Sequence, residues 1–263
     1  MNSSLQTNIF IADCHVHGPE VDGTIMSWVP LFNNYSEYLS YLVKNNISAA
    51  IQSVGCRASD NDALLAENTQ ALELSRTDRL KIVPACILHP EFPEANLEII
   101  SQFKSSGYYW CGELCPYLAG WDLDHPGFNR ICQLLADNNF ILQLHGMEIK
   151  AMSRITSNYS DIPLIISHLG SNRERIMSYI EFAGNNQNVY LDICGSGHER
   201  LGILEYAVNH GLEDRILYGS DFPVNEPGTP IIRVANALLP DEVKLKILGG
   251  NLRSLLASRN MII

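Results

Sequence analysis

Eight short apolar segments alternate with amphipathic stretches along the chain, and this alternation constrains the fold more than any other feature of the sequence. The apolar segments predict β-strands at residues 8–13, 48–54, 81–88, 108–114, 140–145, 164–168, 189–193 and 215–219. Several are almost wholly apolar, which is typical of parallel strands covered by helices on their outer face. Apolar residues at helical spacing between them predict helices at 36–46, 62–77, 94–104, 126–138, 148–159, 172–183, 199–210 and 241–258, the first with Ser36 as its N-cap.

The spacing of the strand ends predicts how the strands are connected. With the ends taken at residues 15, 51, 86, 113, 145, 168, 192 and 221, the steps are 23 to 36 residues long. Each step has room for one strand, one helix and two loops, so the chain is expected to be an α/β protein with a closed (β/α)8 TIM barrel, a single domain over residues 1–263. A doubly wound open sheet is the alternative, but it typically has a glycine-rich phosphate loop after its first strand. The chain has Asp-Cys-His-Val-His-Gly there, which favours the barrel.

Charge and cysteine content narrow the classes of partner and compartment. The net charge is −11, from 18 Lys and Arg against 29 Asp and Glu, and no basic run occurs, which argues against binding nucleic acid or an anionic membrane. No apolar run approaches the roughly 20 residues of a membrane helix, and the first ten residues lack the basic and apolar regions of a signal peptide. The cysteines, Cys14, Cys56, Cys86, Cys111 and Cys194 among them, predict buried free thiols in a reducing compartment. We therefore expect a soluble cytoplasmic protein with a small-molecule substrate, and the sequence leaves a homo-oligomer open.

Metal-ligand residue types stand at the ends of five predicted strands. They are His15 and His17 after the first strand, Glu113 on the fourth, His145 on the fifth, His168 on the sixth and Asp221 after the eighth. The carboxyl ends of all barrel strands face one mouth. Because residues two apart on a strand share a side, His15 and His17 are expected to point inward, with Cys14 and Val16 packed outward on helices. Imidazole and carboxylate groups suit zinc and similar ions, so the sequence predicts a divalent metal site at this mouth.

These residues and three longer motifs resemble one enzyme superfamily. The motifs are Ile-Ser-His-Leu-Gly at 166–170, Tyr-Gly-Ser-Asp-Phe-Pro-Val at 218–224 and Gly-Gly-Asn-Leu-Arg-Ser-Leu-Leu at 249–256. Together with the histidine and acid set they resemble the amidohydrolase superfamily, most closely its amidohydrolase-related branch (family 2), over residues 13–256. The resemblance implies a metal-dependent enzyme on a TIM barrel. The branch includes lactonases, other hydrolases and some decarboxylases, so the resemblance does not name a substrate.

The resemblance also implies roles for single residues. His15, His17 and Asp221 would hold one metal ion, and Glu113, His145 and His168 a second, with Glu113 bridging the two. A glutamate on strand four is similar to the arrangement in TatD-type and phosphotriesterase-like relatives. In members with one metal, His145 would be the further ligand and His168 would contact the substrate or polarise its carbonyl. Some lactonases of the branch work without metal, so the number of ions stays open; zinc is the expected ion and manganese the alternative.

The expected reaction is hydrolysis of a small carboxylic ester, lactone or amide. A bound zinc lowers the pKa of water from 15.7 to about 7, and Asp221 is the expected base for the attacking water, beside His168 as a second catalytic residue. A metal-dependent decarboxylase, a carbon–carbon lyase of the same superfamily, is the alternative; it has no need of a bridging Glu113, and its relatives tend to be longer. A non-enzymatic binding barrel is the third reading, which the complete ligand set disfavours.

Further residues are candidates for substrate contacts or for structural roles. Arg57, Arg173 and His198 follow strands two, six and seven and are the expected substrate-binding residues, the arginines through a substrate carboxylate. We interpret the remaining residues of interest as follows: His89, His125 and His210 as structural, Trp28 as either loop packing or an aromatic wall over the pocket, Cys111 as core, and Cys115 as bordering the pocket. A regular strand four would place Cys111 and Cys115 on the same face as Glu113.

Overall fold

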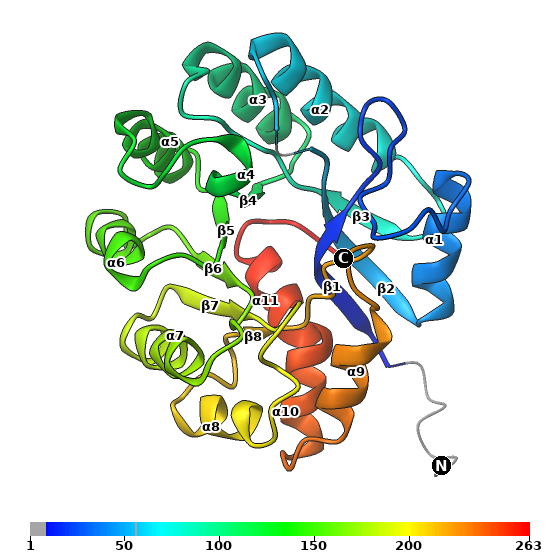
Figure 1. The fold of residues 1–263 in the computed structure, drawn as a ribbon, viewed down its shortest axis with the longest axis vertical. Coiled ribbons are helices and arrows are strands. Elements are labelled where there is room, and N and C mark those ends of the chain that lie inside the picture. The colour runs from blue at the N-terminus through cyan, green and yellow to red at the C-terminus, as the bar shows by residue number, and fades with distance from the viewer. Residues whose placement is uncertain (1–8, 56) are drawn as a thin grey trace.

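The computed structural model describes residues 9–55 and 57–263, and within them parallel strands form a ring enclosed by helices (Figure 1). The strands are β1 (Ile11–His17), β2 (Ile47–Ser53), β3 (Lys81–Pro84), β4 (Trp110–Leu114), β5 (Ile141–His145), β6 (Leu164–Ser167), β7 (Val189–Asp192) and β8 (Ile216–Leu217). The helices are α1 (Tyr35–Lys44), α2 (Asn61–Leu74), α3 (Pro93–Ser105), α4 (Pro116–Ala119), α5 (Pro126–Asp137), α6 (Ile149–Asn158), α7 (Arg173–Asn185), α8 (Ile203–Asn209), α9 (Gly228–Ala235), α10 (Asp241–Leu245), the π-helical turn η1 (Lys246–Gly250) and α11 (Asn251–Ala257).

The ring is closed by backbone hydrogen bonds between two parallel sheets. One sheet has the order β1-β2-β3 and the other β4-β5-β6-β7-β8. At one junction the Cys86 amide donates to the Trp110 carbonyl (2.8 Å), and at the other the Cys14 amide donates to the Tyr218 carbonyl (2.9 Å). The predicted (β/α)8 barrel is therefore confirmed.

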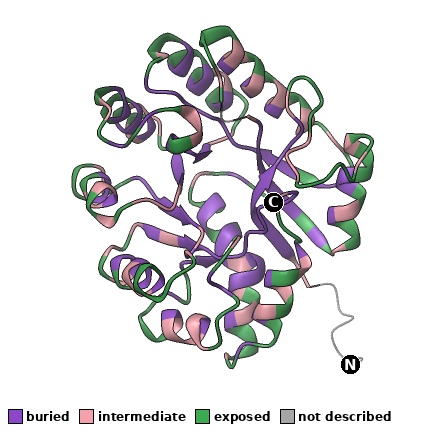
Figure 2. Cartoon of the chain, viewed as in Figure 1, coloured by how far each residue is buried: buried purple, intermediate pink, exposed green. Residues whose placement is uncertain are grey.

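Two apolar clusters, inside and outside the ring, follow from the strand pattern. The inner cluster contains small and aliphatic residues of the strands, with Trp110 the largest, and α11 closes it with Leu252, Leu255 and Leu256. Figure 1 shows α11 near the middle of the ring. The outer cluster lies between the strands and the inward faces of the helices. In Figure 2 the buried residues accordingly gather on the strands and on these helix faces, and the exposed residues face away.

The observed elements overlap every predicted strand and helix, with differences at several ends. Strand β1 continues to His17 instead of ending at residue 13, and its predicted start, Asn8, lies outside the described residues. The N-cap of α1 is Asn34, whose side chain accepts from the Glu37 amide, so the expectation of Ser36 was wrong. The helix predicted from residue 199 begins only at Ile203.

The predicted helix 241–258 is interrupted by η1. Gly249 in this turn lies against β1, and a Cβ there would be 2.9 Å from the Phe10 carbonyl oxygen and 3.1 Å from the Ala12 nitrogen. The absence of a side chain at Gly249 thus lets η1 lie close to β1. The sequence pattern did not predict the short helices α4 and α9.

Two further expectations from the sequence concern the cysteines and membrane-spanning segments. Cys14, Cys86, Cys111 and Cys194 are buried thiols, as expected, and Cys132 is buried as well, whereas Cys56 lies outside the described residues. Over residues 9–55 and 57–263, none of the helices combines the length and the apolar character that a membrane crossing requires.

Candidate metal centre

His15, His17 and Asp221 meet at the carboxyl ends of β1 and β8. His15 Nε2 is 3.1 Å from His17 Nε2, which is 3.0 Å from Asp221 Oδ1, and His15 Nε2 is 3.6 Å from the same oxygen. Backbone hydrogen bonds hold the two segments together, because the Asp221 amide donates to the His15 carbonyl (2.9 Å) and the His17 amide donates to the Phe222 carbonyl (2.8 Å). This part of the barrel closure therefore also assembles the first set of donor atoms.

An irregularity in β1 changes which residues face inward. The pairing with β2 shifts between Asp13 and Val16. Cys14 consequently belongs to the inner cluster, although strict alternation had predicted that it packs outward. Val16 does pack outward, in the outer cluster. The shift lets Cys14 and His15, neighbours in the chain, both lie inside the barrel.

Glu113 on β4 lies between this set and a second one. Its Oε2 is 3.3 Å from His15 Nε2, whereas its Oε1 is 3.0 Å from His145 Nδ1 and 3.3 Å from His168 Nε2. Each carboxylate oxygen therefore faces the histidines of a different set. Cys115 also donates to Oε2 through its thiol (3.1 Å), so it borders the site as expected.

Gly112 determines how Glu113 enters the site. Its φ is +117°, and a Cβ at this position would be 2.1 Å from the Gln143 carbonyl oxygen, so only glycine fits. The pairing of β4 with β5 shifts here, between Cys111 and Leu114. Because of the shift, Cys111 packs in the outer cluster, and the expectation that it shares the face of Glu113 was wrong.

Two of the candidate residues have unusual backbone conformations. His168 and Asp221 have φ values of 64° and 61°, in the left-handed region that residues other than glycine rarely adopt. Such conformations cost about 1–3 kcal/mol each and are concentrated at functional sites. Beside the His168 ring lies Gly195, where a Cβ would be 2.4 Å from His168 Nδ1. The ring therefore needs a glycine at position 195.

Asp192, at the end of β7, is a site residue that sequence reasoning missed. His15 Nδ1 lies 2.7 Å from its Oδ2, and the Gln143 side-chain amide donates to the same oxygen (3.3 Å). Asp192 is completely buried, and a Cβ on Gly219 would be 2.1 Å from its Oδ1. A carboxylate that accepts the Nδ1 proton leaves the Nε2 lone pair of His15 free for an ion. The signal in the sequence was one acid at the end of an otherwise apolar strand.

The charges of the carboxylates and imidazoles compensate one another. Burial alone would raise the pKa of Glu113, but the charge of His15 and the nearby imidazoles outweigh it and hold the pKa well below its usual range. Burial likewise opposes the ionised form of Asp221, yet the hydrogen bond from His17 lowers its pKa. Burial would lower the pKa of His15, but the attraction of Cys194 and Glu113 raises it well above its ordinary value. Glu113 and Asp221 are thus ionised carboxylates beside His15, whose pKa is raised.

The donor atoms fit a divalent cation. A tetrahedral ion with bonds of about 2.0–2.1 Å places its ligands about 3.3 Å apart. The separations in the first set, from 3.0 to 3.6 Å, and those between Glu113 and its histidine neighbours, from 3.0 to 3.3 Å, agree with this value. Two groups within the described residues meet this geometry with the predicted ligands: His15, His17 and Asp221, and Glu113, His145 and His168.

The three predicted substrate-binding residues are in different surroundings. Arg57 and Arg173 are exposed, and within residues 9–55 and 57–263 neither makes an ion pair. His198 is buried, and neither of its ring nitrogens has a hydrogen-bond partner among the described residues. Trp28 is 86% exposed.

The histidines interpreted as structural make local hydrogen bonds. His89 Nε2 is 3.2 Å from the Ala119 carbonyl oxygen, and His125 Nδ1 accepts from the Gly127 amide (3.0 Å) at the N-terminus of α5. His210 follows α8, with Nδ1 2.8 Å from a carbonyl oxygen of its last turn, in agreement with the predicted C-terminal position.

Comparison with known proteins identifies the family. The model of the family described as Amidohydrolase matches residues 12–256, so the chain belongs to this family and is an enzyme of the amidohydrolase superfamily. A divalent metal is expected in this family. No curated protein sequence matches the chain.

The chain is similar to solved structures of proteins that are named for different reactions. A dihydroxybenzoic acid decarboxylase from a Polaromonas species, with bound manganese and an inhibitor, has a TM-score of 0.75 at 15% identity, over 94% of this chain and 97% of that one. A 2,6-dihydroxybenzoate decarboxylase from Rhizobium has a TM-score of 0.71 at 13% identity, over 95% and 99%. A probable 2-pyrone-4,6-dicarboxylic acid hydrolase from Acinetobacter baumannii has a TM-score of 0.63 at 15% identity, over 94% and 99%. At these identities the likeness shows the fold.

Proposed function

We propose that the chain is a metal-dependent hydrolase that cleaves a small carboxylic ester, lactone or amide. The position of Glu113 carries this proposal, because its two oxygens face two donor sets at 3.0 to 3.3 Å. A carboxylate placed in this way suits a pair of ions that act on an attacking water. The likeness to a probable pyrone hydrolase is consistent with it, since a 2-pyrone is a cyclic ester.

In this proposal the ligand residues hold two ions. His15, His17 and Asp221 hold one ion, and Glu113, His145 and His168 hold the second. We propose zinc as the ion, with manganese as the alternative. When bound, the metal polarises the substrate carbonyl and lowers the pKa of water.

Asp221 is the proposed base. Its Oδ1 faces His17 at 3.0 Å, while its Oδ2 accepts from the Asn225 side chain (2.9 Å), so the carboxylate is held in one orientation. Its lowered pKa keeps it ionised near neutral pH, where it can accept a proton from the attacking water and return it to the leaving group. In a site with a single ion, His168 would instead polarise the carbonyl.

Substrate contacts are proposed for residues around the mouth. Arg57 and Arg173 would pair with a substrate carboxylate, and the unpartnered nitrogens of buried His198 would hydrogen-bond to a polar substrate atom. Tyr117 packs its ring 4.8 Å from that of His145, centroid to centroid, and is 59% exposed, so it would contact a substrate that approaches this ligand.

The proposal is tested with purified protein, a panel of esters, lactones and amides, and the Asp221→Asn variant. We expect acid release that depends on the metal, and a loss of about 10²–10⁴-fold in kcat/KM for the variant. Asp241→Asn is the matched control, because the Asp241 side chain is 95% exposed. Undiminished turnover by Asp221→Asn would refute the role of this residue. Elemental analysis of the wild type determines whether one or two ions are bound.

A decarboxylase is the second candidate, because two of the similar solved structures are decarboxylases and one of them contains manganese. The same assay separates the two functions when aromatic carboxylic acids are added to the panel. Carbon dioxide release without hydrolysis of any ester, lactone or amide would favour the decarboxylase and exclude the hydrolase.

A further inference from the structure

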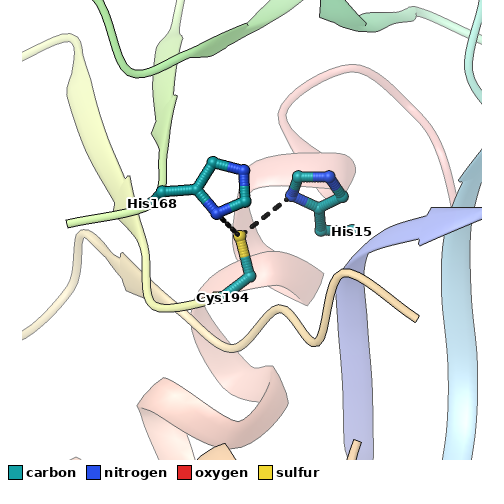
Figure 3. Close-up of side chains that lie close together, drawn as sticks. All are labelled: His15, His168 and Cys194. Atoms are coloured by element: carbon teal, nitrogen blue, oxygen red, sulfur yellow. Dashed lines mark hydrogen bonds between the residues drawn. The ribbon is translucent and has the colours of Figure 1, made fainter. Parts of the chain in front are cut away.

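Cys194 lies between one histidine of each donor set (Figure 3). Its Sγ is 3.1 Å from His15 Nδ1 and 3.2 Å from His168 Nδ1. The side chain is completely buried, in the loop that follows β7. The reaction proposed above uses neither this sulfur nor the Nδ1 atoms that it contacts.

The two Nδ1 atoms differ in the acceptors around them. A histidine that binds an ion through Nε2 carries its proton on Nδ1 and donates it to a neighbouring acceptor. His15 Nδ1 has the Asp192 carboxylate at 2.7 Å, a stronger acceptor than sulfur. For His168 Nδ1, the Cys194 sulfur is the one hydrogen-bond partner within the described part of the chain. Cys194 is therefore the acceptor that the described residues offer to a proton on His168 Nδ1.

The sulfur is itself held in place by Asp192. The Cys194 amide donates to Asp192 Oδ1 (2.9 Å), while the other carboxylate oxygen faces His15. The absence of a side chain at Gly195 then leaves room for the His168 ring beside the sulfur. One short turn after β7 thus contacts a histidine of each donor set.

We propose that Cys194 is a positioning residue, whose sulfur accepts the Nδ1 proton of His168 and thereby presents His168 Nε2 to the ion held with Glu113. The inference rests on the proposed metal-binding role of His168. It assigns no metal bond to the sulfur, which lies on the side of the ring opposite to the atom that faces Glu113.

The test compares Cys194→Ala and Cys194→Ser with Cys132→Ala in the full-length chain. Cys132 is an equally buried thiol in α5, within the outer apolar cluster, so its variant controls for the loss of a buried sulfur. Zinc affinity is measured by competition with a chelator, and zinc content by elemental analysis. We expect Cys194→Ala to weaken the binding of one zinc ion by about 10–100-fold. We expect Cys194→Ser to restore most of this affinity, because a hydroxyl also accepts a hydrogen bond, and Cys132→Ala to leave it unchanged.

Two spectroscopic measurements separate positioning from other roles. In the zinc-loaded protein, an imidazole nitrogen–proton spectrum should show a protected Nδ1 proton of His168 in the wild type and in Cys194→Ser, but not in Cys194→Ala. After cobalt substitution, a thiolate-to-metal charge-transfer band that disappears in Cys194→Ser would make the sulfur a ligand and overturn the proposal.

Unchanged zinc affinity in Cys194→Ala, or equal losses in Cys194→Ser and Cys194→Ala with both variants folded, would also overturn it. A wild type that binds no zinc would remove the inference together with the metal site. Zinc binding without any hydrolysis would refute the proposed reaction and leave the role of Cys194 standing, because these measurements need no substrate.

Discussion

Asp192→Asn is the most informative single change that the structure suggests. Among the residues that the structure describes, the carboxylate has three hydrogen-bond partners, and all of them can donate: His15 through Nδ1 at 2.7 Å, Gln143 through its side-chain amide at 3.3 Å and Cys194 through its backbone amide at 2.9 Å. An asparagine has one oxygen and one NH2 group. In this position its NH2 must face at least one donor, and no rotation of the amide avoids the conflict.

The size of the effect follows from this conflict. A buried polar group without a partner costs about 1–3 kcal/mol. If the NH2 faces His15, it favours the tautomer with the proton on Nε2, the atom that lies 3.1 Å from His17 Nε2 and 3.3 Å from Glu113. The ion would then have to displace this proton. Loss of such a carboxylate partner typically weakens metal binding by about 10–100-fold, which corresponds to roughly 1.4–2.7 kcal/mol.

The assay is zinc affinity by chelator competition, paired with thermal unfolding of the zinc-free protein. Asp241→Asn, an exposed acid-to-amide change, is the control for both measurements. Affinity within about twofold of the wild type in folded Asp192→Asn would refute the reasoning, since 1.4 kcal/mol is already tenfold.

Three further predictions address the ligands and their protons. Glu113→Gln leaves one carbonyl oxygen to serve two donor sets, so elemental analysis should find one ion fewer per chain than in the wild type; equal contents would contradict the bridging role. Gly195→Ala places a Cβ 2.4 Å from His168 Nδ1 at a φ of +64°, so denaturant titration should show a free energy of unfolding lower by about 1–3 kcal/mol; an unchanged midpoint would contradict it. Burial alone would lower the pKa of His15 and of His168, but the attraction of Cys194 and Glu113 raises both, that of His168 to about 12, so an arriving ion should displace protons from these imidazoles. Zinc affinity should therefore rise with pH; calorimetry in buffers of different ionisation enthalpy measures the release, and a value near zero would refute the assignment.

The barrel and most of the candidate ligands were predictable because both depend on position along strands. Each strand is short and apolar, so its end could be placed to within a few residues, and the carboxyl ends of barrel strands share one mouth. His15, His145 and His168, which come from three strands, could for that reason be expected near one another, and the structure brings them together with Glu113 and Asp221. That they hold metal is a proposal.

Other features depend on local backbone geometry that periodicity does not reveal. The shift in β1 places Cys14 inside, and the glycine at 112 turns β4 so that Glu113 but not Cys111 enters the site. Asp192 was missed because a single acid at a strand end has no partner in its own segment. Its contact with His15 lies 177 residues away in sequence, so only the folded barrel reveals it.

The backbone bonds that close the barrel have a consequence for the order of folding. His17 and Asp221 are separated by 204 residues, and the Asp221 amide is bonded to the His15 carbonyl at the junction of β1 with β8. Bringing together two residues this far apart in the sequence has an entropic cost of roughly 5 kcal/mol. The first donor set therefore forms only when the ring closes, and a growing chain on the ribosome cannot assemble it until residues beyond β8 have emerged. The ion held by His15, His17 and Asp221 would thus bind to a finished barrel and would not nucleate it.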